Sequence, residues 1–252
     1  MKKILLKTES LSKSFSSGGV LQHVLKNIDL ELYEGDFTVI MGASGAGKST
    51  LLYALSGMDT PTLGRITFGG EVISDYNPDE LAVFRRRHCG FVFQQIYLID
   101  GMSLMDNVLA AGLLVNKDRK ALAERAGELF RAVNIPEETW HKFPTQISGG
   151  EAQRAGIVRG LINSPEILYA DEPTGALNSR TGLQVLDTLT EFNRRGQSVV
   201  MVTHDMRSAR RGNRILYLQD GVILGECSLG AYEHGDVKRH EKLSAFLTEM
   251  GW

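Results

Sequence analysis

The chain has 252 residues, of which 42% are hydrophobic, and this length allows one large core or two modest ones. A formal net charge of -2 gives no basic surface of the kind that nucleic-acid-binding proteins use, so we expect no nucleic-acid partner. Cys89 and Cys227 are too few for a disulfide framework. The first apolar run, residues 4–6, is too short for a signal peptide, and no run approaches the roughly 20 apolar residues of a membrane helix. We therefore expect a chain that is soluble by itself and reaches a membrane only through a partner.

The first elements in chain order are strands. Residues 8–15, 25–33 and 65–73 alternate between apolar and polar side chains, which predicts antiparallel β-structure. The apolar run DFTVIM at residues 36–41 lies among them and is followed, after a glycine-rich loop, by the helical segment at 49–57. An N-terminal antiparallel β subdomain joined to a different core is therefore predicted.

Four strands with nearly continuous apolar residues form the predicted core. They are residues 36–42, 89–94, 166–173 and 198–205. Helical segments alternate with them, including residues 182–196 with Gly196 as the C-terminal cap. This alternation predicts an α/β fold with a mainly parallel sheet covered by helices, and the Asp-Gly pair within residues 217–226 predicts a hairpin.

The middle of the chain has a helical pattern. Residues 103–115, 119–134 and 149–164 carry apolar side chains at helical spacing. We predict a helical subdomain over 95–164, inserted into a core made of 1–94 and 165–226, and a C-terminal tail with a short amphipathic helix over 227–252. The whole chain, residues 1–252, is then a single domain without internal repeats.

A phosphate-binding loop is the clearest motif. The segment GASGAGKST matches G-x-x-x-x-G-K-[ST] and lies between a predicted strand and a predicted helix, which is the context that the motif requires. Backbone N–H groups wrap the phosphates, Lys48 offsets the β/γ charge, and the Ser49 hydroxyl binds Mg²⁺. The expected nucleotide site comprises Gly42, Ala43, Ser44, Gly45, Ala46, Gly47, Lys48, Ser49 and Thr50.

Polar residues follow three of the core strands. Asp171 and Glu172 end one strand, and because neighbouring side chains point in different directions we assign Asp171 to the Mg²⁺ shell and Glu172 to the attacking water as general base. His204 ends another strand and is expected at the same ligand-binding edge, in reach of the γ-phosphate. Gln94 follows a third strand, where its amide can reach Mg²⁺ or the attacking water.

A second candidate anion site begins the last helix of the insertion. Residues 147–154 read ISGGEAQR, so a serine and two glycines open a helix whose N-terminal N–H groups suit a phosphate. The chain already has a phosphate loop about a hundred residues earlier. The residues alone do not explain why it carries two.

These stretches together resemble the nucleotide-binding subunit of an ABC transporter over nearly the whole chain. The loop at 42–50 resembles the Walker A motif, FVFQ the Q-loop, ISGGEAQR the signature, EILYADEP the Walker B motif, GALNS the D-loop and THD the H-loop. The resemblance implies a P-loop NTPase core that binds ATP and Mg²⁺ and hydrolyses ATP. It also implies a pair of subunits, expected to be identical, in which Ser148, Gly149, Gly150 and Glu151 of one complete the ATP site of the other, and Phe15 stacks on adenine.

Two departures from the family pattern accompany the resemblance. The signature has Ile147 and Glu151 where Leu and Gln are commonest, and the D-loop ends in Asn178 where Asp is usual. We expect Asn178 to alter communication between the two sites, because an amide supplies no charge.

Gly175 and the flanking residues are similar to the group that serves macrolide export, lipoprotein release, cell division and bacitracin-type peptide resistance. The resemblance implies a peripheral subunit on the cytoplasmic face of the membrane that powers a transmembrane permease, with removal of antimicrobial peptides as the first hypothesis for the substrate. Ile96, Tyr97, Leu98 and Ile99 are the expected permease contact, the alternative being that they pack inside the insertion.

Other classes of protein fit the sequence less well. A soluble ABC ATPase of DNA repair or chromosome organisation is the main alternative, but it places a long coiled coil between Walker A and the signature, and no sustained heptads occur here. A small-molecule kinase leaves ISGGEAQR without a role. The substrate, the direction of transport and the identity of the permease stay open.

Overall fold

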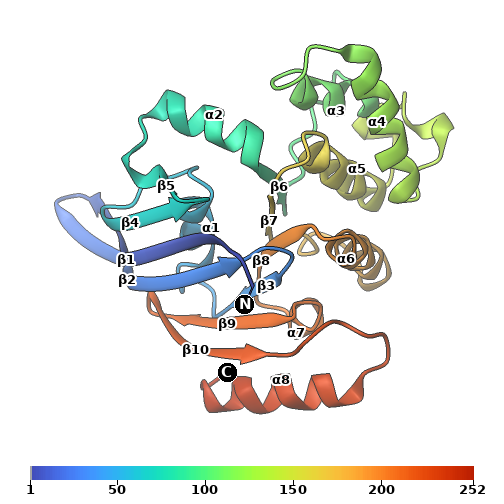
Figure 1. Ribbon diagram of the computed structural model, residues 1–252. Helices are drawn as coiled ribbons and strands as arrows, with labels where there is room; N and C mark the ends of the chain where they lie inside the picture. The colour runs from blue at the N-terminus through green and yellow to red at the C-terminus, as the bar shows by residue number, and fades with distance from the viewer. Residues whose placement is uncertain (1) are drawn as a thin grey trace. The chain divides into compact units, whose positions relative to one another are not determined.

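A computed structural model describes residues 2–252, and the chain forms two compact units (Figure 1). The first unit comprises the residues up to Ala82 together with Asn193–Trp252, and the second comprises Val83–Phe192. Among the described residues, no helix combines the length and the apolar character that a membrane crossing requires.

An antiparallel sheet forms one part of the first unit, as the alternating pattern predicts. Its strands follow the order β2-β1-β4-β5, with bounds Val20–Tyr33, Ile4–Ser17, Leu63–Phe68 and Glu71–Val72. Gly18 and Gly19 join β1 to β2 and both have positive φ, +57° and +81°. Such a two-residue turn matches the right-handed twist of the strands that it connects.

The second set of strands in the first unit is mostly parallel. Its order is β10-β9-β3-β8, with bounds Val222–Ser228, Arg214–Gln219, Phe37–Met41 and Ser198–Thr203. β3 runs parallel to both β8 and β9, and all of its residues are buried. The predicted hairpin is confirmed, because β9 and β10 pair antiparallel around Asp220 and Gly221. α1 (Lys48–Leu55) follows β3, and α7 (Met206–Ala209) follows β8.

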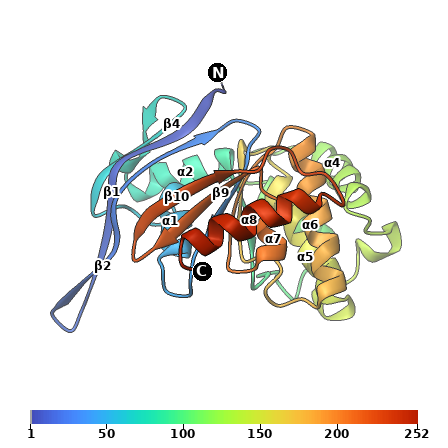
Figure 2. The ribbon, with the colours of Figure 1, turned by 90° about the horizontal axis from the view of Figure 1, so that it is seen from below.

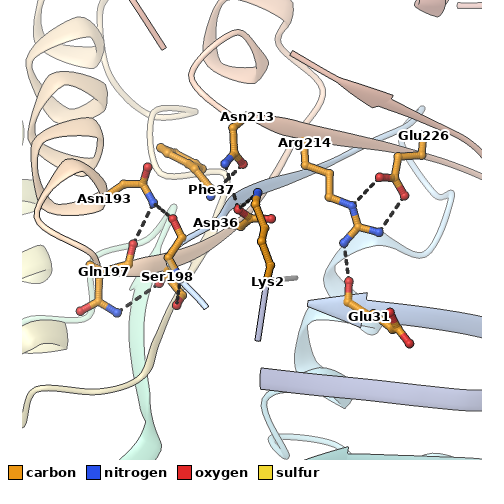
Figure 3. A network of polar contacts seen from close by, with 11 residues as sticks. Lys2, Glu31, Asp36, Phe37, Asn193, Gln197, Ser198, Asn213, Arg214 and Glu226 are labelled. Carbon is orange, nitrogen blue, oxygen red and sulfur yellow. Dashed lines mark hydrogen bonds and ion pairs between the residues drawn. The ribbon is translucent and has the colours of Figure 1, made fainter. Parts of the chain in front are cut away.

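A polar network fixes the start of β3 (Figure 3). Asp36 is 5% exposed and accepts hydrogen bonds from Lys2 Nζ at 2.5 Å and from Asn213 Nδ2 at 3.0 Å. Asn213 Oδ1 in turn accepts from the N–H of Phe37 at 3.0 Å. Because a buried carboxylate keeps its hydrogen-bond partners, these contacts fix the backbone at Asp36 and Phe37. The strand that carries the phosphate loop at its far end is therefore anchored at its beginning.

The C-terminal helix α8 (Val237–Glu249) lies along β9 and β10 in both ribbon views (Figures 1 and 2). Gly225 of β10 packs closely against Met250, and the ring of Trp252 meets that of Tyr217 edge to face, with centroids 6.2 Å apart. Arg239 is 3% exposed and donates to the carbonyls of several residues: Arg210, Gly212, Leu229, Gly230 and Ala231. The predicted amphipathic tail is therefore a docked helix.

The second unit combines two strands with helices. β6 (Cys89–Phe93) and β7 (Ile167–Asp171) pair in parallel. α3 (Leu104–Gly112), α4 (Arg119–Ala132) and α5 (Gly149–Leu161) enclose an apolar cluster that includes Phe130 and Trp140, whose rings stack at 5.5 Å. Ser103, Asp118 and Ser148 cap these three helices with their side chains, as helix starts favour. α2 (Pro78–His88) and α6 (Ser179–Arg194) lie mostly in this unit, which also has short 3₁₀ turns at Glu137–Thr139 and Pro144–Gln146, and a further 3₁₀ turn at Ile73–Asp75 lies in the first unit.

Candidate functional site

The phosphate loop follows β3 and leads into α1, as its sequence context predicts. Gly42 has a φ of +157°, and a Cβ added there would lie 2.1 Å from the carbonyl oxygen of Leu218, so only glycine fits. Lys48 is 7% exposed, and its Nζ donates to the carbonyls of Gly42 at 2.9 Å and Ala43 at 2.8 Å. The ammonium is thus held over the loop that it is expected to serve. Ser49 and Thr50 follow in the first turn of α1, whose N-terminus favours an anion.

His204 leaves the sheet beside this loop. Met41, the last residue of β3, pairs in parallel register with Thr203, the last residue of β8. The residues that follow the two strands, Gly42 and His204, therefore lie at the same edge of the sheet. His204 is exposed there. Phe15 lies on β1 with 44% of its surface exposed, and Lys13 Nζ is 4.9 Å from its ring centroid. An exposed aromatic face of this kind can stack on a purine.

The carboxylates lie in the second unit, where the parallel register aligns them with Gln94. Asp171 ends β7 and pairs with Phe93, which ends β6, so Glu172 and Gln94 leave the strand pair at one edge. Glu172 has a φ of +44°, a left-handed conformation that is uncommon for a residue with a side chain and recurs at functional sites. The N–H of Gly175 donates to the carbonyl of Glu172 at 3.0 Å and closes the turn.

The side chain of Gln94 lies against that turn. A Cβ added at Gly175 would be 2.8 Å from Gln94 Nε2 and 3.0 Å from its Cδ. Any side chain at position 175 must therefore displace the amide. This packing gives a physical reason for a glycine at position 175, and it links the segment after β7 to the segment after β6.

The signature opens α5 with a reciprocal cap. Ser148 Oγ accepts from the N–H of Glu151 at 3.3 Å, while Glu151 Oε2 accepts from the Ser148 N–H at 2.9 Å and from its hydroxyl at 2.7 Å. Ser148 and Gly149 are exposed, whereas Gly150 is buried and a Cβ there would lie 2.1 Å from Thr181 Cγ2. The two glycines therefore differ: Gly150 lets α6 approach, and Gly149 leaves the helix start accessible.

The cap at Glu151 makes a pH-dependent prediction. Hydrogen bonds from the Ser148 hydroxyl and then from its N–H lower the pKa of the Glu151 carboxyl below its ordinary value of 4.5. A carboxyl with a lowered folded-state pKa stabilises the helix start above its unfolded pKa, and this stabilisation is lost as the pH falls through the folded value. We expect the amide chemical shift of Ser148, followed by NMR, to titrate below pH 4.5. The same titration in Glu151→Gln would contradict the assignment.

Sequence reasoning did not foresee the structural roles of two polar residues in this unit. Asn178 Oδ1 accepts from the N–H of Thr181 at 3.0 Å and so caps α6, a role that Asp and Asn fill equally well. Asn107 is 3% exposed; its side chain donates to the carbonyls of Ile99, Met102 and Ser103 and accepts from the Ile99 N–H. The sequence signal for Asn107 was an amide side chain on a helix face that is otherwise apolar.

The segment expected to contact a permease divides into exposed and packed residues. Tyr97 and Ile99 are 60% and 54% exposed. Leu98 instead packs on the apolar cluster of the helices, and Ile96 lies over Gly156. The packing alternative therefore applies to Ile96 and Leu98, whereas permease contact by Tyr97 and Ile99 stays a prediction.

Residues 25–175 match the family model described as "ABC transporter". The chain is 43% identical over 226 residues to the macrolide export ATP-binding/permease protein MacB of Escherichia coli, covering 90% of this chain and 35% of that protein. It is 39% identical to an uncharacterized ABC transporter ATP-binding protein of Methanocaldococcus jannaschii, covering 87% of this chain and 98% of that one. The chain thus spans about a third of the length of its macrolide-export relatives.

Solved structures share the fold. A dimeric post-hydrolysis state of an ATP-binding cassette bound to ADP and Pi superposes with a TM-score of 0.81 at 37% identity, covering 90% of this chain and 100% of that one. A dimeric bacterial ABC transporter cassette gives the same values. The α/β architecture expected from the sequence is confirmed.

Proposed function

The chain belongs to the ABC transporter family, and we propose that it is an ATP-hydrolysing domain, two identical copies of which enclose two ATP molecules to drive a membrane-spanning permease. The observation that carries the proposal is the exposed start of α5. Ser148 and Gly149 present a capped helix N-terminus in the second unit, whereas the phosphate loop with Lys48 belongs to the first. The start of α5 is a second anion site besides the phosphate loop, and it has a role if it binds the nucleotide held by another copy of the chain. Dimeric cassettes among the solved relatives support this arrangement.

The residues fit a magnesium nucleotide. The described residues contain no group of three or more His, Cys, Asp or Glu side chains that could hold a metal by themselves. Mg²⁺ is commonly held by one or two protein oxygens, substrate phosphates and water, and Ser49, Asp171 and Gln94 supply such oxygens. When bound, the ion offsets charge on the phosphates. Lys48 and the loop N–H groups bind the phosphates, and Phe15 stacks on the base.

Hydrolysis then depends on the polar residues at the strand ends. Glu172 accepts a proton from the attacking water, Gln94 orients that water, and His204 contacts the γ-phosphate. The partner's Ser148, Gly149 and Gly150 close over the same phosphate, with the positive end of α5 directed at its charge. Loss of the γ-phosphate removes the contact that joins the copies, so hydrolysis reopens the dimer.

We assign the domain to the cytoplasmic face of the membrane, where ATP is available, in a system for export or mechanical removal of substrate. Relatives named macrolide export ATP-binding/permease proteins support this direction. The substrate classes that we propose are antimicrobial peptides, lipid-linked compounds and lipoproteins. A soluble ABC ATPase of DNA repair is not favoured by these relatives.

Tyr97 and Ile99 form the proposed contact with the permease. Both are exposed, and the Asn107 amide holds the backbone of Ile99 and the loop that follows it. An aromatic residue on a fixed backbone is a common anchor at protein interfaces. A short helix of the permease can dock against this pair.

Replacing Tyr97 and Ile99 together by Ser should lower permease-dependent transport at least about tenfold, because interface anchors contribute roughly 2 kcal/mol or more. The measurement is substrate efflux from proteoliposomes that contain the full transporter, with ATP-dependent dimerisation followed in parallel. The double variant Leu114→Ser, Val115→Ser is the matched control, since both residues are exposed and apolar in the same unit. Unchanged efflux in the first variant would refute the docking surface.

A further inference from the structure

The segment around Gln94 is held by side chains of the signature helix α5. Gln153 Nε2 donates to the carbonyl of Phe93 at 2.9 Å. Arg159 donates through Nη1 to the carbonyl of Tyr97 at 2.5 Å and through Nη2 to that of Ile96 at 2.7 Å. Side chains of one helix thus hydrogen-bond to the backbone on both sides of Gln94.

The two Arg159 contacts use the geometry that distinguishes arginine from lysine. A planar guanidinium directs two parallel N–H groups at two acceptors, and a lysine ammonium cannot reproduce that fork. Both acceptors are uncharged carbonyls, and burial lowers the pKa of Arg159. Part of the hydration of this cation is exchanged for two backbone contacts on one short segment.

The backbone at this place needs such support. Tyr97 has a φ of +52°, in the left-handed region that costs energy for a residue with a side chain. Its ring meets Phe93 edge to face, with centroids 5.6 Å apart. Ile96 packs on Gly156, where an added Cβ would be only 3.2 Å from Ile96 Cγ2. The segment therefore rests on α5 through apolar and polar contacts together.

α5 carries the signature at its other end. The helix runs from Gly149 to Leu161, and Ser148 caps its start. A hydrogen-bonded helix of this length behaves as a rod, so groups attached to its two ends keep their spacing. Arg159 ties the Q-loop segment to the same rod that presents Ser148.

We propose that Arg159 is a positioning residue of the ATPase reaction, which sets the place of Gln94 by fixing the backbone of Ile96 and Tyr97. The inference rests on the role proposed above for Gln94.

The test compares Arg159→Lys with Arg125→Lys in the full chain. Arg125 donates to the carbonyls of Ile162 and Leu161 from α4, so its lysine variant loses the same kind of fork away from Gln94. Hydrogen exchange of the peptide 94–99 and ATP turnover are measured for each. We expect Arg159→Lys to speed exchange in this peptide about tenfold and to lower kcat about tenfold with the KM for ATP changed less than about twofold, because hydrogen bonds to charged groups are the stronger ones. Arg125→Lys should leave both readouts within about twofold.

A double-mutant cycle separates positioning from general destabilisation. In a Gln94→Ala background, Arg159→Lys should cost less than about twofold in kcat, because the group that it positions is gone. An equal loss in both backgrounds, or unchanged exchange at 94–99, would overturn the proposal. If Gln94→Ala itself retains full turnover, the proposed role of Gln94 fails, and positioning through Gln94 fails with it. Faster exchange at 94–99 in Arg159→Lys would then show that the Arg159 contacts exist and that only the role of Gln94 was wrong. Should Arg159→Lys not fold, Gln153→Met removes the neighbouring contact at similar volume and is expected to give the same two changes.

Discussion

Glu172→Gln should lower ATP turnover by about 10²–10⁴-fold, the range that a general base contributes. Gln is isosteric with Glu and can occupy the same backbone conformation, whose φ is +44°. The amide cannot accept a proton from water, so the chemical step slows while the phosphate loop still binds ATP. Steady-state phosphate release gives the rate, and size-exclusion chromatography with ATP should show the variant accumulating as a dimer.

Glu166→Gln is the matched control for this experiment. Glu166 immediately precedes β7, at the opposite end from Glu172, and pairs with His88 at 3.0 Å with both side chains substantially exposed. Exposed pairs contribute little to stability, so turnover should stay within about twofold of the wild type. If Glu172→Gln turned over ATP as fast as Glu166→Gln, Glu172 would not be the base.

Two inactive variants should restore activity when they are mixed. Lys48→Ala removes the ammonium that lies over the phosphate loop, and Ser148→Arg fills the exposed start of α5. Each variant alone should lose at least about 100-fold in turnover, because an electrostatic contact to the reacting phosphate is lost. Random assortment makes half of the dimers hybrid, and each hybrid has one intact site, so about a quarter of the wild-type sites are expected.

The mixture experiment depends on sites that are shared between copies. Phosphate release is measured after the two variants have been incubated together without nucleotide, and mixtures of each variant with itself are the controls. Recovery near a quarter supports signature residues acting in trans. A Ser148→Arg protein that is fully active alone, or a mixture that stays inactive, would contradict the proposed dimer.

The strands and motifs could be predicted because their determinants are local. Residues 37–41 are apolar except for Thr38, and the strand β3 has the buried pattern that such a run implies. The helix starts at Ser103, Asp118 and Ser148 follow from the chemistry of capping side chains. The phosphate loop was recognisable from its spacing and from its place between a predicted strand and a predicted helix, since its glycines and Lys48 act within a few residues of one another.

The contacts within the candidate site could not be predicted in the same way. Leu98 and Ile99 are neighbours of similar hydrophobicity, yet one packs on the helices and the other is exposed. Periodicity does not separate them, because the segment from 95 to 102 is not helical and has no repeating face. The Asn107 amide, from the next helix, hydrogen-bonds to the N–H and the carbonyl of Ile99 and so fixes the backbone at the exposed residue.

The sequence by itself determined the family and the order of the elements, and it contains the motifs whose residues we propose to meet nucleotide. These properties depend on short motifs and on hydrophobic periodicity, which are encoded among near neighbours. Only the tertiary structure decided that Gln94 rests on Gly175 and that Arg159 holds the segment after β6 through two backbone carbonyls. Contacts of this kind depend on packing at the ångström scale between distant residues or on the exact course of a turn, and no local pattern records either.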